Sequence, residues 1–331
     1  MSHAAFVAIG TCVPDRVVTN AELAQYMDTS DEWITQRTGI QERRWVEPGV
    51  GSAELAFRAA SRALAEAKWR ASDLDAIIFA SLSPDHMFPG DGCFLNAKLG
   101  LPGVPALDIR NQCSGFLYGL SIADAWIRAG VYRRILLVGS EVHSTGLDVS
   151  TRGRDVSVIF GDGAAAALLE ATDDPGRGVL GVTIHADGRH ATDLWTDAPG
   201  SLHHPRVSHE MIDSGAIYPH MEGHKVFKHA VVRMPEALRR LLEARGLTTA
   251  DIKVLVCHQA NLRISEATQK SLGLRDDQVF NNIQKYGNTT AASIPLALAE
   301  AVPARGVRRG DLVALCAFGA GFTWGAALAR W

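Results

Sequence analysis

Two segments of the chain recur at a nearly constant offset, and this repeat limits the possible folds more than any other feature. Residues 73–81 (DLDAIIFAS) align with residues 251–259 (DIKVLVCHQ) at an offset of 178, each after an amphipathic helical pattern. Residues 130–134 (GVYRR) align with residues 306–310 (GVRRG) at an offset of 176, each before an apolar strand pattern. Strands that alternate with helices are typical of α/β layers. We therefore predict a duplicated α/β fold, with one half in residues 1–175 and the other in residues 176–331.

Cys113 stands at the start of a predicted helix and is a candidate nucleophile. Apolar residues recur at helical spacing from Phe116 to Ile127, so the cysteine precedes the first helical turn. Free N–H groups and the helix dipole favour a thiolate there, so we expect a thiol pKa below the free value of about 8.5. The small neighbours Ser114 and Gly115 leave room for a substrate carbonyl. A buried structural cysteine is the alternative, and this segment alone leaves both interpretations open.

Two polar residues of the second half complete a candidate site. His258 ends the predicted strand at residues 254–258, where a polar side chain projects from a sheet edge into a crevice. Asn288 lies in a Gly-Asn turn, and the repeat offset places the next residue, Thr289, opposite Cys113. Each alone is better explained as an ordinary strand-end histidine or turn asparagine. Together with Cys113 they supply a nucleophile, an imidazole and an amide donor, the groups needed for acyl transfer through a thioester.

Composition argues against several other classes of function. The 331 residues carry a net charge of −3, so nothing in the overall charge indicates a nucleic acid or a membrane surface as partner. The five cysteines are odd in number and never form a C-x-x-C pair, which argues against a disulfide framework and a zinc knuckle. The histidines of residues 185–224 are predicted to be solvated loop side chains rather than metal ligands. No apolar run approaches the roughly 18 residues of a spanning helix, so we expect a soluble, cytoplasmic protein without a metal or redox cofactor.

Six segments spread along nearly the whole chain match one known family. They are residues 28–40 (DTSDEWITQRTGI), 111–116 (NQCSGF), 159–164 (IFGDGA), 258–263 (HQANLR), 286–289 (YGNT) and 317–325 (AFGAGFTWG). On these segments the chain resembles β-ketoacyl-[acyl-carrier-protein] synthase III of the thiolase-like superfamily. The resemblance implies two similar αβαβα halves in five layers and a homodimer.

The resemblance also implies a reaction. Cys113 would be acylated by an acyl-CoA primer. His258 and Asn288 would bind the thioester carbonyl of malonyl-acyl carrier protein while it decarboxylates. The product would be a β-ketoacyl-acyl carrier protein, and the reaction would initiate fatty acid biosynthesis. The backbone N–H groups of Cys113 and Ala320 would form the oxyanion hole.

Further binding residues follow from the resemblance, position by position. For CoA, the resemblance implies Trp33 and Arg152 around the adenine, Arg37 at the phosphates and Asn261 along the pantetheine arm. For the acyl chain, it implies Phe318 beside the tunnel and Phe88, which would reach the tunnel across a dimer interface. An acidic carrier protein would dock on cationic helix residues near the tunnel mouth, for which a solvated helix face is the alternative explanation. These residues are Lys225, Lys228, Arg263 and Lys270.

Two departures from the family pattern leave the substrates open. Residues 110–112 (RNQ) replace the small residues that some members carry before the cysteine, and residues 190–222 have no close family match. An acyltransferase or ketosynthase of secondary metabolism or signal biosynthesis, with a different acceptor, is therefore the main alternative. A papain-like cysteine hydrolase also has Cys, His and Asn in chain order, but its cysteine-flanking signature is missing. A non-enzymatic binding protein is least favoured, because nothing structural requires all three polar residues.

Overall fold

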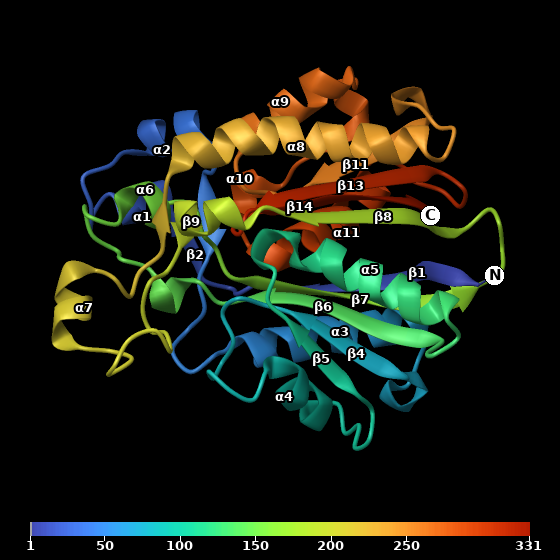
Figure 1. Ribbon diagram of the computed structural model, residues 1–331, viewed down its shortest axis with the longest axis horizontal. Helices are drawn as coiled ribbons and strands as arrows, with labels where there is room; N and C mark the ends of the chain where they lie inside the picture. The colour runs from blue at the N-terminus through green and yellow to red at the C-terminus, as the bar shows by residue number, and fades with distance from the viewer. Residues whose placement is uncertain (1) are drawn as a thin grey trace.

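The chain folds into five stacked layers, in which helices and sheets alternate (Figure 1). The computed structural model describes residues 2–331, and within them two five-stranded sheets form the second and fourth layers. The first sheet has the strand order β1-β7-β6-β4-β5, with β1 (His3–Cys12), β4 (Ala76–Ala80), β5 (Ala106–Ile109), β6 (Arg134–Glu141) and β7 (Gly163–Thr172). The second has the order β12-β11-β13-β14-β8, with β8 (Gly178–Ala186), β11 (Ile252–Cys257), β12 (Val279–Phe280), β13 (Leu312–Gly319) and β14 (Thr323–Arg330).

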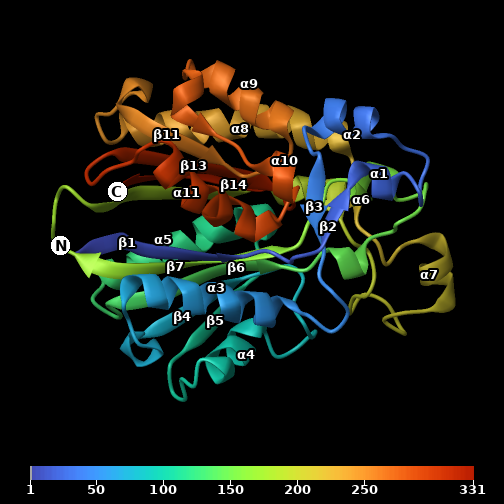
Figure 2. The ribbon, with the colours of Figure 1, turned by 180° about the vertical axis from the view of Figure 1, so that it is seen from behind.

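Helices cover both faces of each sheet. The helices α5 (Gly115–Arg128) and α11 (Ser293–Ala304) lie between the sheets (Figures 1 and 2). The outer face of the first sheet is covered by α3 (Ser52–Ala67) and α4 (Asp91–Lys98), and that of the second by α8 (Gly223–Glu243) and α9 (Leu262–Leu272). The apolar residues of α5 recur at helical spacing and form one buried stripe. Its buried side chains include Phe116, Leu117, Leu120, Ala123 and Ile127.

The strand order of the two sheets is the same, which confirms the predicted duplicated fold. Strands β1, β7, β6, β4 and β5 correspond to β8, β14, β13, β11 and β12, and the corresponding pairs run parallel or antiparallel in the same way. The repeated sequence segments form β4 and β11 and lead into β6 and β13. The first sheet ends at Thr172 and the second begins at Gly178.

Shorter elements cover the end of the sheets where the candidate site lies. One cluster buries apolar residues of these elements around the fully buried Arg43, whose guanidinium donates to Asn20 Oδ1 and to the Val158 carbonyl at 2.7 Å each. Its elements are β2 (Val17–Thr19), α1 (Asn20–Leu23), α2 (Asp31–Thr38), β3 (Glu42–Arg44), α6 (Arg154–Ser157) and α10 (Ile283–Tyr286). The predicted loop at residues 185–224 also contains short elements: β9 (Leu194–Trp195), α7 (His209–Ser214) and β10 (His220–Met221). Among residues 2–331, no helix is both long and apolar enough to cross a membrane.

Candidate active site

Cys113 lies in a 3₁₀ turn (Gln112–Ser114) directly before α5, so its predicted position at a helix start is confirmed. Its neighbour Gln112 has a φ of 41°, which is uncommon for a residue with a side chain. The Ser114 hydroxyl donates to the Thr323 carbonyl at 3.1 Å. Across from the turn, a Cβ atom on Gly319 would lie 3.0 Å from the Cys113 sulfur. The turn therefore holds the sulfur tightly against the end of β13.

The thiol of Cys113 is neutral in the resting site. Burial raises its pKa to about 12, and the nearby Glu141 carboxyl group adds to the rise. Hydrogen bonds from the backbone N–H groups of Cys113 and Ala320 and from the Thr290 hydroxyl lower the pKa but do not offset burial. The predicted lowering of the thiol pKa is therefore wrong, because desolvation outweighs the helix start. The backbone N–H groups of Cys113 and Ala320 nevertheless lie beside the sulfur, close enough to lower its pKa.

His258 follows β11 and is 2% exposed. Its Nδ1 lies 2.6 Å from Ser293 Oγ, at the first residue of α11. Its Nε2 is buried and has no hydrogen-bond partner within the part of the chain that the structure describes. Burial, with a smaller contribution from His143, lowers the pKa of His258 to about 3, so the imidazole is neutral. Because a buried polar atom without a partner is rare, Nε2 is placed to meet a substrate atom.

Asn288 lies in the turn between α10 and a 3₁₀ helix (Thr290–Ala292) and is buried. Its backbone N–H donates to the Ile159 carbonyl at 2.9 Å, and its carbonyl accepts from the Gly161 N–H at 3.1 Å. The N–H of Thr290 donates to the Asn288 side-chain oxygen at 2.8 Å. Since this bond fixes the amide oxygen as the acceptor, the NH₂ group is oriented as a donor.

The turns that carry Cys113 and Asn288 meet at the seam between the two halves. A Cβ atom on Gly139, in β6, would lie 2.4 Å from the Ala291 carbonyl oxygen. Only a glycine in β6 therefore lets the turn after Asn288 approach the first sheet this closely.

Glu141, at the end of β6, was missed by the sequence analysis. It is fully buried, and its carboxylate accepts from the Ser83 hydroxyl at 2.6 Å, the Leu82 N–H at 3.1 Å and the Ala291 N–H at 3.4 Å. Burial raises its pKa to about 7. The signal was an acidic residue at the end of an apolar strand, where a charge is costly unless it is paired or hydrogen-bonded.

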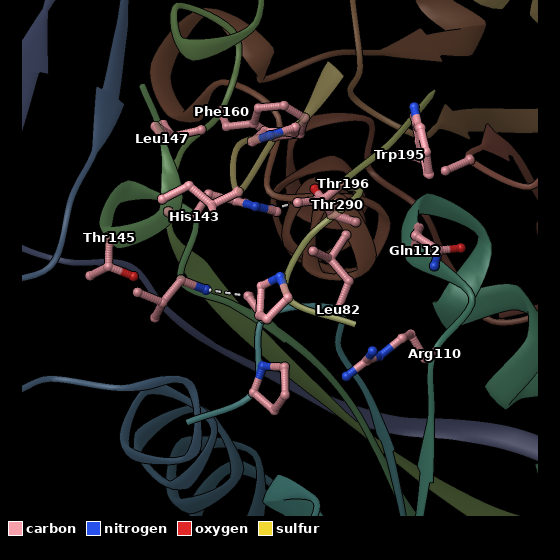
Figure 3. A pocket seen from close by; sticks show the side chains of 18 of the residues that line it. Leu82, Arg110, Gln112, His143, Thr145, Leu147, Phe160, Trp195, Thr196 and Thr290 are labelled. Atoms are coloured by element: carbon pink, nitrogen blue, oxygen red, sulfur yellow. Dashed lines mark hydrogen bonds between the residues drawn. The ribbon is translucent and has the colours of Figure 1, made fainter. Parts of the chain in front are cut away.

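A cavity of about 1070 Å³ opens beside Cys113 (Figure 3). Much of its wall is apolar and includes Leu82, Val142, Leu147, Phe160 and Trp195. Polar side chains also line it, among them Arg110, Gln112, His143, Thr145 and Thr196. Phe318 and Phe88 do not line this cavity. Phe318 is buried against Phe322 with ring centroids 4.8 Å apart, whereas Phe88 is 82% exposed.

The predicted CoA residues are only partly brought together. The guanidinium groups of Arg37 and Arg154 lie 4.4 and 4.8 Å from the centre of the Trp33 ring. Arg152 instead pairs with Asp148 at 2.5 Å. The structure thus places Arg154, which the sequence analysis missed, where Arg152 was expected.

Asn261 lies near the Trp33 group. Its side-chain NH₂ donates to the Arg37 carbonyl at 2.9 Å, and its oxygen accepts from the Arg263 N–H at the start of α9. Trp33, Arg37, Arg154 and Asn261 therefore share one rim of the molecule.

The four predicted docking cations lie on the adjacent helices α8 and α9 (Figure 1). All four side chains are exposed. Lys225 forms an ion pair with Asp193 at 2.7 Å, and the Arg263 guanidinium lies 5.6 Å from the centre of the Phe227 ring. Over residues 2–331, no group of three or more His, Cys, Asp or Glu side chains could hold a metal ion.

Comparison with known proteins gives one consistent family. Residues 107–188 match the family model described as 3-oxoacyl-[acyl-carrier-protein (ACP)] synthase III, and residues 242–331 match that of its C-terminal part. β-Ketoacyl-[acyl-carrier-protein] synthase III of Caldanaerobacter subterraneus is 42% identical, covering 99% of this chain and 98% of that protein. The synthase III of Rhodospirillum centenum is 44% identical over 97% of both chains. The crystal structure of 3-oxoacyl-[acyl-carrier-protein] synthase III from Aquifex aeolicus covers 99% of this chain and 100% of its own, with a TM-score of 0.91 and 39% identity.

Proposed function

Because the chain belongs to the 3-oxoacyl-[acyl-carrier-protein] synthase III family, we propose that it condenses an acyl-CoA primer with malonyl-acyl carrier protein and so initiates fatty acid synthesis. The products are a β-ketoacyl-acyl carrier protein, carbon dioxide and CoA. The observation that carries this proposal is the meeting of Cys113, His258 and Asn288 at the seam, with the Nε2 of His258 buried and without a hydrogen-bond partner among the described residues. The chemistry requires no metal or redox cofactor.

The first half-reaction transfers the acyl group to Cys113. The sulfur attacks the thioester carbonyl, and the carbonyl oxygen becomes negatively charged in the tetrahedral intermediate. The N–H groups of Cys113 and Ala320, which lie beside the sulfur, stabilise that charge. The acyl chain then occupies the cavity beside the thiol.

The second half-reaction uses His258 and Asn288 as neutral donors. Ser293 Oγ accepts the Gln259 N–H at 3.3 Å, so its own proton can go to Nδ1 of His258, which leaves Nε2 as an N–H donor. The NH₂ of Asn288 is the second donor. Both donate to the thioester oxygen of the malonyl group, where negative charge develops as carbon dioxide leaves.

The experiment that tests the function follows the acyl group through both half-reactions, first on the protein and then on the carrier. The purified protein is incubated with a panel of acyl-CoA primers, and its intact mass is measured. Malonyl-acyl carrier protein is then added, and the carrier-bound product and carbon dioxide are measured. We expect one added acyl mass, followed by its transfer to the carrier as a β-ketoacyl group. A product formed on a different acceptor, with malonyl carrier protein inert, would contradict the proposed function.

We expect Arg154→Ala to weaken the binding of acyl-CoA, because Arg154 and Arg37 both lie against the Trp33 ring at the proposed adenine site. Loss of a cation–π contact and a charge should raise the KM for acyl-CoA about tenfold with little change in kcat. Arg152→Ala is the matched comparison, since this arginine is two residues away and pairs with Asp148. A larger KM increase for Arg152→Ala would favour Arg152 as the adenine contact.

We further propose that α8 and α9 dock the carrier protein, supported by the exposed cations Lys225, Lys228, Arg263 and Lys270. Charge reversal by Arg263→Glu should raise the KM for malonyl carrier protein, because it replaces attraction to the acidic carrier by repulsion. The increase should be largest at low salt, because above 0.1 M salt the Debye length falls below about 10 Å and surface charges are screened. The rate of acyl-CoA loading should not change. An unchanged KM at low salt would rule out this surface.

We also propose a cytoplasmic homodimer. The loop at residues 84–90 exposes Met87 and Phe88, and β5 leaves one edge of the first sheet without a neighbouring strand among the described residues. Pairing of two copies along this edge would cover both features. Sedimentation equilibrium measures the mass in solution.

A further inference from the structure

A charged side chain, that of Arg110, lines the cavity beside Cys113. Arg110 follows β5 directly and stands three residues before the nucleophile. Figure 3 shows the side chains of Arg110 and Gln112 directed from this segment toward the cavity. Much of the remaining wall is apolar, which suits the methylene groups of an acyl chain. A guanidinium on that wall is not explained by an aliphatic chain, because an alkyl group offers a charge no partner.

Arg110 has no counter-charge within its own chain. Across residues 2–331, its guanidinium takes part in no ion pair. Asp108, two residues earlier, accepts the Gly92 N–H at 2.9 Å. Asp85, which lines the same cavity, accepts the Ala53 N–H at 3.4 Å at the start of α3, where the helix dipole favours a negative charge. The positive charge of Arg110 is therefore available to another group.

The backbone between Arg110 and Cys113 is fixed by the fold. The φ of 41° at Gln112 is a conformation that persists only where its surroundings enforce it. The Ser114 hydroxyl ties the next residues to the end of the second sheet through the Thr323 carbonyl. Three peptide units span at most about 11 Å, which limits the distance between the Cα atoms of Arg110 and Cys113. A group that binds Arg110 while its acyl carbon meets the sulfur therefore belongs to a short chain.

We propose that Arg110 selects a primer whose acyl chain ends in a carboxylate, that is, the mono-CoA thioester of a short dicarboxylic acid. This inference rests on the proposed function and names its substrate class. The planar guanidinium forms two parallel hydrogen bonds with a carboxylate, and an aliphatic primer cannot replace them. The spacing of Arg110 and Cys113 suits a chain of about four to six carbons. Its methylene groups would lie on the apolar wall, which includes Leu82 and Val142.

The position of Arg110 at the edge of the first sheet strengthens this selection. In a single chain Arg110 is exposed, and it follows β5, the edge strand along which we propose that the second copy packs. Pairing along this edge would remove water from the guanidinium and so raise the cost of leaving its charge unpaired. A carboxylate of the second copy is the competing partner for Arg110, and the mass of the protein in solution distinguishes it from the primer.

The distal carboxylate takes no part in the bond changes. The Cys113 sulfur forms a bond to the thioester carbon, the bond from that carbon to CoA breaks, and CoA leaves with the thiol proton. Condensation then releases carbon dioxide from the malonyl group and transfers the acyl group to the remaining two carbons on the carrier. The product is a β-ketoacyl-acyl carrier protein that retains the carboxylate, and no oxidant or other reactant is needed.

The test compares glutaryl-CoA with pentanoyl-CoA, which has the same number of acyl carbons and no carboxylate. We expect wild type to load glutaryl-CoA with a kcat/KM about tenfold higher. Arg110→Met should lower glutaryl loading about 10²-fold, in the range for loss of hydrogen bonds between charged groups, and leave pentanoyl loading within about twofold. Arg110→Lys keeps the charge but not the paired donors, so its loss should be about tenfold. Arg133→Met, at an exposed arginine after α5, controls for the loss of a surface charge.

Unchanged pentanoyl loading in Arg110→Met shows that the variant is folded. A wild type that loads glutaryl-CoA no better than pentanoyl-CoA would overturn the inference, as would equal losses of both in Arg110→Met. Sedimentation equilibrium should give the same mass for Arg110→Met as for wild type. A lower mass with an unchanged primer preference would assign Arg110 to the contact between copies and would also overturn the inference. Failure of wild type to form an acyl-enzyme with any primer, or to transfer it to malonyl carrier protein, would instead overturn the proposed function.

Discussion

Cys113→Ala should abolish both acyl-enzyme formation and condensation. Removing a catalytic nucleophile typically costs about 10⁶-fold in rate, so the product should fall below detection. The structural reason is that this sulfur is held against the end of β13, beside the backbone N–H groups proposed as the oxyanion hole. Intact mass after incubation with acetyl-CoA or a longer acyl-CoA is the measurement, and hydroxylamine should remove the added mass from wild type.

Cys93→Ala is the matched control for this experiment. Cys93 is an exposed free cysteine on α4 that does not line the cavity. Its replacement should leave the acyl mass and the rate unchanged. An acyl mass that persists in Cys113→Ala would show that another residue is the nucleophile.

Asn288→Asp should separate the two half-reactions. The carboxylate keeps the oxygen that accepts the Thr290 N–H but loses the NH₂ donor. Removal of one donor to a developing oxyanion costs about 10²–10³ in rate, so condensation should fall by that factor while acyl loading stays near wild type. Single-turnover acyl-enzyme formation and carbon dioxide release are compared in the same preparation.

Asn288→Ala should lower condensation at least as much. It also leaves the N–H of Thr290 without its acceptor, so a small loss of loading is expected in addition. Equal losses of loading and condensation in Asn288→Asp would show that Asn288 only holds the site together. The proposed division between the two half-reactions would then be wrong.

The fold could be predicted because the sequence repeats itself. The offsets of 178 and 176 place the segments of β4 and β11, and of β6 and β13, in equivalent positions, and the two sheets share one strand order. The turns of Cys113 and Asn288 could be placed opposite each other by the same arithmetic. Local sequence patterns were sufficient to predict the fold because both repeated halves form the same arrangement of helices and strands.

Other features of the site depend on contacts that no local pattern contains. The thiol pKa is decided by burial against Gly319 and by Glu141, which come from different parts of the chain, so the helix start alone predicted the wrong direction. Arg152 and Arg154 are two residues apart, and only the path of the turn before α6 decides which of them reaches Trp33. The contact of His143 with Thr290 joins residues 147 apart, and nothing in either segment signals it.

The neutral resting state of Cys113 has a consequence for the chemical durability of the protein. Oxidants and simple electrophiles react with thiolates, and a thiol whose pKa is about 12 offers them almost none at physiological pH. The same cysteine becomes nucleophilic when a substrate carbonyl oxygen binds to the two backbone N–H donors and the thiol proton can leave. The nucleophile is thus protected from damage between turnovers, and a covalent inhibitor gains selectivity by presenting a carbonyl to those donors rather than by greater intrinsic reactivity.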